Sequence, residues 1–137
     1  MAGKLVNQGE VIMLKASVNH TAPQNLVMRL YKNDWTPAEG DTESAATEAD
    51  FTGYSAKTLA GASWTATPGA PSSIEYAAQE FASSANQATQ NIYGWYLTQE
   101  TSGLLVAAER FSSPLPFSTD VDAVMLTPVI TLADSTD

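Results

Sequence analysis

The 137-residue chain contains no cysteine and a single histidine, His20. Without cysteine, disulfide bridges and thiolate metal sites are excluded, and one histidine cannot form a histidine-rich zinc site. A Ser-His-Asp triad would have to use His20, which lies in a predicted turn, and the sequence has no GxSxG elbow. We therefore predict that the chain is not an enzyme and needs no metal or cofactor.

Basic residues are also scarce, with six Lys and Arg against fifteen Asp and Glu, a formal net charge of −9. No basic residue occurs between Lys57 and Arg110. A protein that binds duplex nucleic acid neutralises phosphates with clustered cations, so this composition argues against a nucleic-acid partner. An acidic charge of this size favours solubility and disfavours self-association at low salt.

Long hydrophobic runs are absent, so no membrane span is expected. The first fifteen residues include Lys4, Glu10 and Lys15 around their only apolar run, which makes them a poor secretory signal. We expect a soluble protein made in the cytoplasm. Its length fits one domain over residues 1–137, and such a chain buries roughly two thirds of its unfolded surface without a covalent staple.

The apolar pattern changes its period after residue 25. Val11, Leu14 and Val18 recur at helical spacing within residues 10–18, and Met13 and Ala16 could widen that stripe; a strand is the alternative. The turn residues 19–23, which end at a proline, predict that any helix is short. Residues 26–31 then alternate, which predicts a strand with one face made of Leu26, Met28 and Leu30 and the other of Val27, Arg29 and Tyr31.

Further strands are predicted at residues 51–59, 74–81, 92–98, 104–111 and 123–132. Gly53 interrupts the first of them, and Pro128 is expected at a bulge or an edge. The strands at 92–98 and 104–111 form the best hairpin candidate. About six short strands and at most one short N-terminal helix predict an all-β fold, a β-sandwich of jelly-roll or Greek-key type, with a barrel as the alternative.

Two groups of charged residues are candidates for a metal site or a catalytic site. Glu39, Asp41 and Glu43 present alternating oxygens to a possible Ca²⁺ ion, but the DxDxDG loop is missing, so a solvated acidic loop is favoured. Glu109 is the least ordinary carboxylate because it lies in a predicted strand beside Arg110 and Phe111. An exposed ion pair at a strand edge is the favoured interpretation, and no catalytic or metal residue is assigned.

Aromatic residues supply the candidate contact sites: Trp35, Tyr54, Trp64, Tyr93 and Trp95. They could stack on a sugar or form a subunit interface, although strand aromatics more often belong to a core. Strict alternation places Tyr93 and Trp95 opposite Ile92 and Tyr96. If both faces of this strand are aromatic, we expect one to cover the core and the other to meet a second sheet or a neighbouring subunit.

Three stretches together resemble a family of small virion proteins of tailed bacteriophages. They are NLVMRLYKNDWTPAEGDT at 25–42, ADFTGYSAKTLAGASW at 49–64, and YGWYLT at 93–98 with LLVAAERF at 104–111. In order and spacing they are similar to capsid decoration (cement) proteins and to head or tail accessory proteins.

The resemblance implies a β-rich homotrimer that binds the major capsid protein on the outer surface of the capsid and stabilises it. Localisation in the virion, after synthesis in the host cytoplasm, follows from the same resemblance. A decoration protein bridges several capsid subunits, so modest contacts combine into tight attachment. The competing hypothesis is a carbohydrate- or receptor-binding β-sandwich module of a phage tail, with aromatic residues on loops as the stacking groups.

Overall fold

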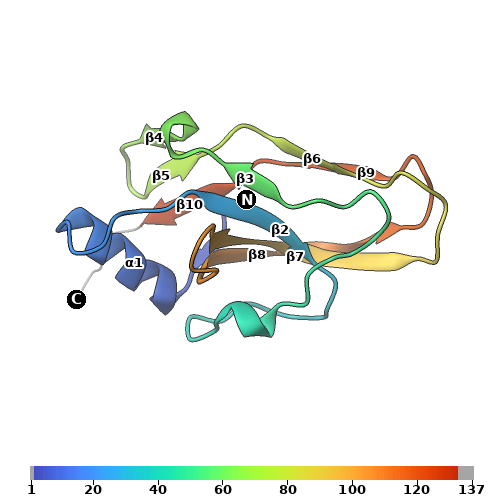
Figure 1. Ribbon diagram of the computed structural model, residues 1–137, viewed down its shortest axis with the longest axis horizontal. Helices are drawn as coiled ribbons and strands as arrows, with labels where there is room; N and C mark the ends of the chain where they lie inside the picture. The colour runs from blue at the N-terminus through green and yellow to red at the C-terminus, as the bar shows by residue number, and fades with distance from the viewer. Residues whose placement is uncertain (1, 133–137) are drawn as a thin grey trace.

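The computed structural model describes residues 2–132 and is mostly β-strand, which confirms the all-β prediction. A five-stranded sheet has the order β1-β8-β7-β2-β3, a three-stranded sheet the order β10-β5-β4, and β6 pairs with β9. Figure 1 shows these parts as two layers of a sandwich-like fold. The elements are β1 (Lys4–Leu5), α1 (Asn7–Ser17), β2 (Leu26–Tyr31), β3 (Lys57–Leu59), β4 (Thr65–Thr67), β5 (Ser72–Glu75), β6 (Gln79–Ala82), β7 (Gln90–Gln99), β8 (Leu105–Phe117), β9 (Ala123–Leu126) and β10 (Val129–Leu132), with 3-10 turns at Glu43–Ala45 and Gly61–Ser63.

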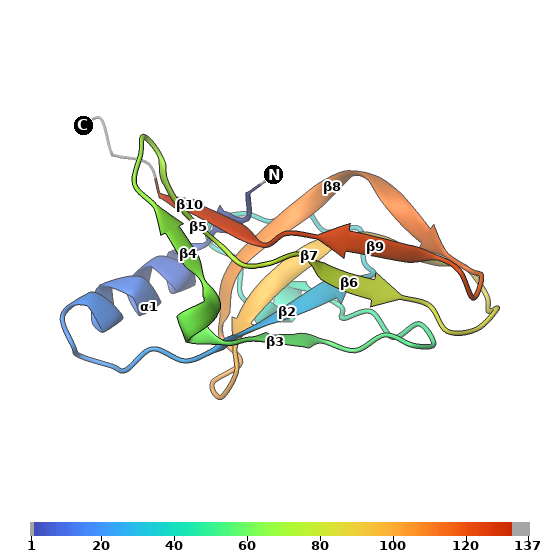
Figure 2. The same ribbon diagram turned by 90° about the horizontal axis from the view of Figure 1, so that it is seen from above.

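The second layer is built from two long segments that were predicted as single strands. Each segment divides in two, because β5 and β6 replace the strand predicted at 74–81, and β9 and β10 replace the one at 123–132. The break falls at Pro128, which has no N–H to donate, while its carbonyl accepts the N–H of Tyr76 at 3.1 Å. Figure 2 shows β5 to β6 and β10 to β9 running side by side across the five-stranded sheet.

The predicted orientation of β2 is confirmed. Met28 and Leu30 are fully buried in the main core between the layers, with Leu26 packed against it. Tyr31 belongs to a second cluster on the opposite face of the sheet. The central position of β2, paired with β7 and β3, therefore leaves it with two apolar faces.

The predicted hairpin is also present, as β7 and β8, but its assignment of faces is partly wrong. The ladder shifts register between Ile92 and Gly94. A β-bulge adds a residue and reverses the alternation after it, so Ile92 lies in the main core with Trp95 while Tyr93 packs with Tyr96. Gly94 fits the crowded bulge, since an added Cβ would lie 2.1 Å from the Glu109 carbonyl oxygen.

Other boundaries differ from the prediction because turn chemistry shortens the strands. Only Lys57–Leu59 of the strand predicted at 51–59 is extended in a sheet, and Gly53 adopts a left-handed φ of 96°. The short strands β1 and β4 were not predicted. β4 lies in a region rich in glycine and proline where the pattern predicts no strand, and it pairs with β5.

The helix α1 is confirmed, but the apolar stripe that predicted it faces outward. Gly9 is the buried residue of α1, and an added Cβ there would lie 2.2 Å from the Val106 carbonyl oxygen, so glycine permits α1 to lie directly on β8. Val11, Leu14 and Val18 are 49%, 66% and 74% exposed. The helix ends as predicted at the 19–23 turn, with Asn19 in the left-handed region at φ 57°.

The outer face of the five-stranded sheet is covered by residues 32–50. Trp35 from this segment packs edge-on against Tyr31, with ring centroids 4.9 Å apart, and against Tyr96. Val6, Leu105 and Ala108 complete this outer cluster. The second aromatic face therefore meets the chain's own acidic segment, and it does not require a neighbouring subunit to be covered.

Candidate functional site

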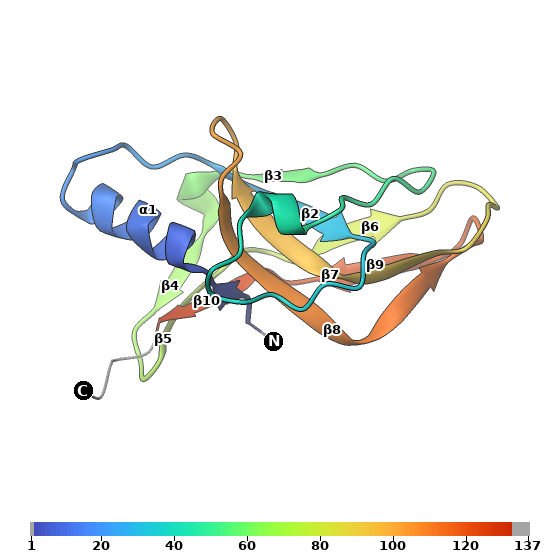
Figure 3. The ribbon, with the colours of Figure 1, turned by 90° about the horizontal axis from the view of Figure 1, so that it is seen from below.

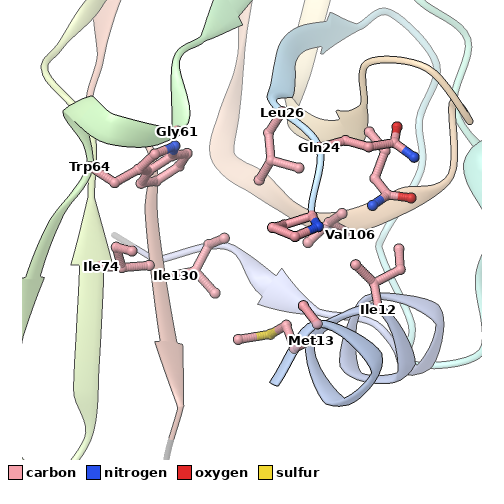
Figure 4. Close-up of a pocket in the computed structure, with 12 residues that line it drawn as sticks. Ile12, Met13, Gln24, Leu26, Gly61, Trp64, Ile74, Val106 and Ile130 are labelled. Atoms are coloured by element: carbon pink, nitrogen blue, oxygen red, sulfur yellow. The ribbon is translucent and has the colours of Figure 1, made fainter. Parts of the chain in front are cut away.

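An open apolar hollow lies at the end of the sandwich where α1 is attached. Here the two layers splay apart, and α1 spans part of the gap (Figure 3). The resulting pocket has a volume of about 260 Å³. Figure 4 shows Trp64 and Ile74 of the smaller sheet's side facing Ile12 and Met13 of α1, with Leu26 of β2 between them.

Two glutamine side chains supply amide groups to the wall of this pocket. Gln24 and Gln99 line it, and both side-chain oxygens are already engaged by the 100–103 turn: Gln24 Oε1 accepts the N–H groups of Thr101 and Ser102, and Gln99 Oε1 accepts the Ser102 hydroxyl at 2.7 Å. Neither amide NH₂ donates a hydrogen bond to another described residue. The pocket can thus accept an apolar group that carries a hydrogen-bond acceptor at one end.

Sequence reasoning missed this pocket because its wall comes from several segments that are far apart in the chain. Ile12, Pro23 and Ile130, for example, lie on a helix, a turn and the last strand. Periodicity within one segment carries no information about which distant segments splay apart. The only local signal was Trp64, an aromatic residue within a Gly-, Pro- and Ser-rich stretch.

Exposed apolar side chains gather beside the pocket. Of the large hydrophobic residues exposed in the described part of the chain, Val11, Met13, Leu14, Val18 and Leu132 belong to α1 or to the end of β10 beside it. Leu14 and Leu132 line a second hollow together with Leu5. The other two exposed residues are Val121, just before β9, and Met125, within β9, and this strand lies at the far end of the molecule from α1 (Figure 2).

The aromatic candidates divide into buried and accessible residues. Trp95 is 1% exposed in the main core, and Trp35 is 8% exposed in the outer cluster, so neither ring offers a face to a ligand. Tyr54 is half-buried, and its hydroxyl donates to Glu48 at 2.7 Å. Tyr93 lies under the Arg110 guanidinium, whereas Trp64 lines the pocket. Of the five, Trp64 is therefore placed best to contact a ligand.

The acidic segment that covers the sheet, residues 32–50, is called the excursion below. Its carboxylates accept hydrogen bonds that hold it in place. Asp41 Oδ2 accepts both the Trp35 indole N–H and the Ala38 amide at 2.8 Å. Glu43 Oε2 accepts Gln8 Nε2 and the Leu105 amide, and the Gln8 bond is the main reason that the pKa of Glu43 is lowered. Across residues 2–132, no group of three or more metal-ligating side chains comes together. These carboxylates fasten the excursion to the sheet.

A partly buried ion pair fastens the excursion at a second point. Arg29 Nη1 donates to both oxygens of Glu48 at 3.0 Å, and Arg29 Nε donates to the Thr98 hydroxyl. Burial first, and then the bond to Glu48, raise the pKa of Tyr54. Because one carboxylate serves both Arg29 and Tyr54, this network fixes the start of the loop that leads to β3.

The remaining titratable candidates lie apart from one another. His20 is exposed in the turn after α1, where its Nδ1 lies 2.9 Å from the Thr21 hydroxyl. Glu109 is half-buried on β8, and burial raises its pKa, while Arg110 beside it pairs with Asp34 and not with Glu109. The ion pair expected for Glu109 is therefore not formed, because Arg110 pairs with Asp34 in the segment 32–50.

No family model, curated protein or solved structure matches this chain. Within residues 2–132, no helix has both the length and the apolar character needed to cross a membrane.

Proposed function

We propose that this chain is a structural protein of a tailed-phage virion, specifically a capsid decoration protein that binds the outer capsid surface as a homo-oligomer. The observation that carries the proposal is the concentration of exposed apolar side chains and an open apolar pocket at one end of an acidic sandwich. A patch of this kind on a small domain marks a contact surface for another protein.

The sequence resemblance supports the same function through its position in the fold. Its stretches at 25–42, 49–64, 93–98 and 104–111 contain β2, β3 and most of the β7–β8 hairpin. These strands make up four of the five strands in the larger sheet. The stretches that carry the resemblance therefore include most of the larger sheet and part of the segment 32–50 that covers it. They do not include α1.

Attachment to a capsid suits a molecule of this construction. Each copy presents an apolar pocket at one end, and several copies joined in an oligomer contact several capsid subunits at once, which multiplies weak contacts into stable binding. The net charge of −9 keeps the free protein soluble before it attaches. The proposed role needs binding alone and no bond chemistry.

The test is co-sedimentation of the purified full chain with phage heads that were assembled without it. We expect saturable binding, together with greater resistance of the decorated heads to heat. His20→Ala and Glu109→Gln should bind as the unaltered protein does, because neither residue belongs to the apolar end. Failure to bind heads by a folded protein, or a requirement for the protein during head assembly, would contradict the proposal.

The second candidate is a carbohydrate- or receptor-binding module, and Trp64 in the pocket wall is the observation that favours it. Because Trp35 and Trp95 are buried, a glycan in the pocket should change the fluorescence of Trp64 most. A glycan-induced shift in the unaltered protein that disappears in Trp64→Phe would support this candidate. An unchanged spectrum across a glycan panel would argue against it.

A further inference from the structure

Lys15 and Glu10 flank an exposed apolar row on α1 and its C-cap, which we define as Val11, Leu14 and, at the cap, Val18. In a seven-residue repeat, Val11 and Val18 occupy position a and Leu14 occupies position d, the two positions that form the seam of a coiled coil. Glu10 and Lys15 then occupy g and e, the positions that border the seam. The buried Gly9 and the half-buried Ile12 and Ala16 lie on the opposite side of the helix.

We propose that the apolar row of α1 packs against the same row of another copy of this chain, with the helices parallel about a rotation axis. The occupant is a second copy because the surface has the repeat that α-helices use to pair with themselves. This inference rests only on the oligomeric part of the proposed function, and it does not depend on capsid binding.

The charges select the parallel arrangement. In a parallel pair, position g of one helix faces position e of the next repeat on its neighbour, five residues later, so Glu10 faces Lys15 of the other copy. An antiparallel pair sets position g beside g and position e beside e, so Glu10 would not face Lys15 of the other copy. Neither residue takes part in an ion pair among the described residues, so both are available.

Charge also explains why association would occur at this end of so acidic a molecule. Beside the row, Lys15 balances the acid Glu10, and the other residues that line the adjoining hollow are apolar. Two copies that meet here keep most of their fifteen acidic residues away from the interface. The remaining long-range repulsion is screened by salt, so association should strengthen as ionic strength rises.

Three side chains make a seam well below the roughly 800 Å² per partner of a typical stable interface. Leu132 and Met13 extend the apolar surface on one side of the helix, which indicates a weak, concentration-dependent association that attachment to a shell would reinforce. Valine at a with leucine at d favours two strands over three in parallel coiled coils. The measured mass therefore also decides between a dimer and the trimer implied by the resemblance.

Sedimentation equilibrium of the full chain over a range of concentrations and salt tests the inference. We expect a mass of two or three protomers at high concentration, and the protomer mass for Leu14→Glu. Val121→Glu is the matched control, because Val121 is 81% exposed near β9, and it should associate like the unaltered protein. Circular dichroism should show both variants folded, since each side chain is largely solvent-exposed.

Charge exchange tests the orientation. Glu10→Lys and Lys15→Glu should each weaken association, and the double variant should restore it, because only a parallel seam pairs positions g and e of different copies. A strictly monomeric chain, or association that Leu14→Glu leaves unchanged, overturns the inference. Charge variants that all associate equally would overturn the parallel arrangement. A monomer that still binds heads would refute the inference and leave the capsid-binding function standing.

Discussion

The outer face of the five-stranded sheet and the outer face of α1 both carry rows of apolar side chains, but the chain covers only the first. Residues 32–50 lie over Tyr31 and Tyr96 and are fastened by Asp41, Glu43 and Glu48. Nothing in the described chain covers Val11, Leu14 and Val18. The acidic loop, which composition alone would assign to solvent, is thus the lid of a hydrophobic cluster, while the helix with the clearer apolar pattern remains exposed.

The difference shows that apolar periodicity identifies an element but not what covers it. On the sheet, the covering segment follows β2 directly, so closing the loop costs little conformational entropy. On α1, the inner side already rests on β8 through Gly9, and a helix cannot turn both sides toward one sheet. The following predictions test how unequal the two surfaces are, beginning with the largest effect.

Alkaline pH should unfold the covered face completely. Burial raises the pKa of Tyr96 to about 12 and raises the pKa values of Tyr31 and Tyr54 further. Because the folded-state values exceed the unfolded value of about 10, the associated stability is fully present below that pH and is lost as pH rises through and above it. Tyrosinate absorbance and circular dichroism should change together in this range; early ionisation of all tyrosines in a folded protein would contradict this account.

Replacing Trp35 with alanine should lower the free energy of unfolding by about 3 to 5 kcal/mol, since it removes a buried aromatic ring and leaves a cavity. The substitution also removes the indole N–H that Asp41 accepts. Urea denaturation measures the loss. A loss of less than about 1 kcal/mol in unfolding free energy would mean that residues 32–50 do not cover the outer cluster in solution.

Gly9→Ala should cost about 1 to 3 kcal/mol, because the new methyl group would overlap the Val106 carbonyl and push α1 away from β8. Gly40→Ala is the matched control, since an added Cβ there meets no atom within 4 Å and Gly40 is exposed. The control should unfold at nearly the unaltered urea concentration. Equal effects of the two substitutions would show that α1 tolerates a wider separation from the sheet.

The smallest effect is expected for Leu14→Ala in dilute protein, where the free energy of unfolding should change by less than about 0.5 kcal/mol. Leu14 is largely exposed and contributes little to the folded protomer. The same substitution should become destabilising as protein concentration increases, because association adds to stability by mass action. A large loss at low concentration would place Leu14 in the core and remove the contrast between the two faces.

The sequence by itself determined the elements whose signals are local. Alternation in residues 26–31 predicted β2 and its buried side, the aromatic and branched residues predicted the β7–β8 hairpin, and helical spacing before the 19–23 turn predicted α1. Composition excluded disulfides and thiolate metal sites, because the necessary residues are missing. These inferences hold because each depends on neighbours within a few positions along the chain.

Tertiary structure alone decided which surfaces meet. The bulge at Ile92–Gly94 placed Ile92 on one face with Trp95 and Tyr93 on the other with Tyr96. Pro128 and its partner segment divided two predicted strands, and the pocket around Trp64 arose where the layers separate. Trp35 and Trp95, equal to Trp64 as candidates in the sequence, became buried. Each of these outcomes depends on contacts between residues far apart in the chain, and no local pattern encodes which distant segment supplies them.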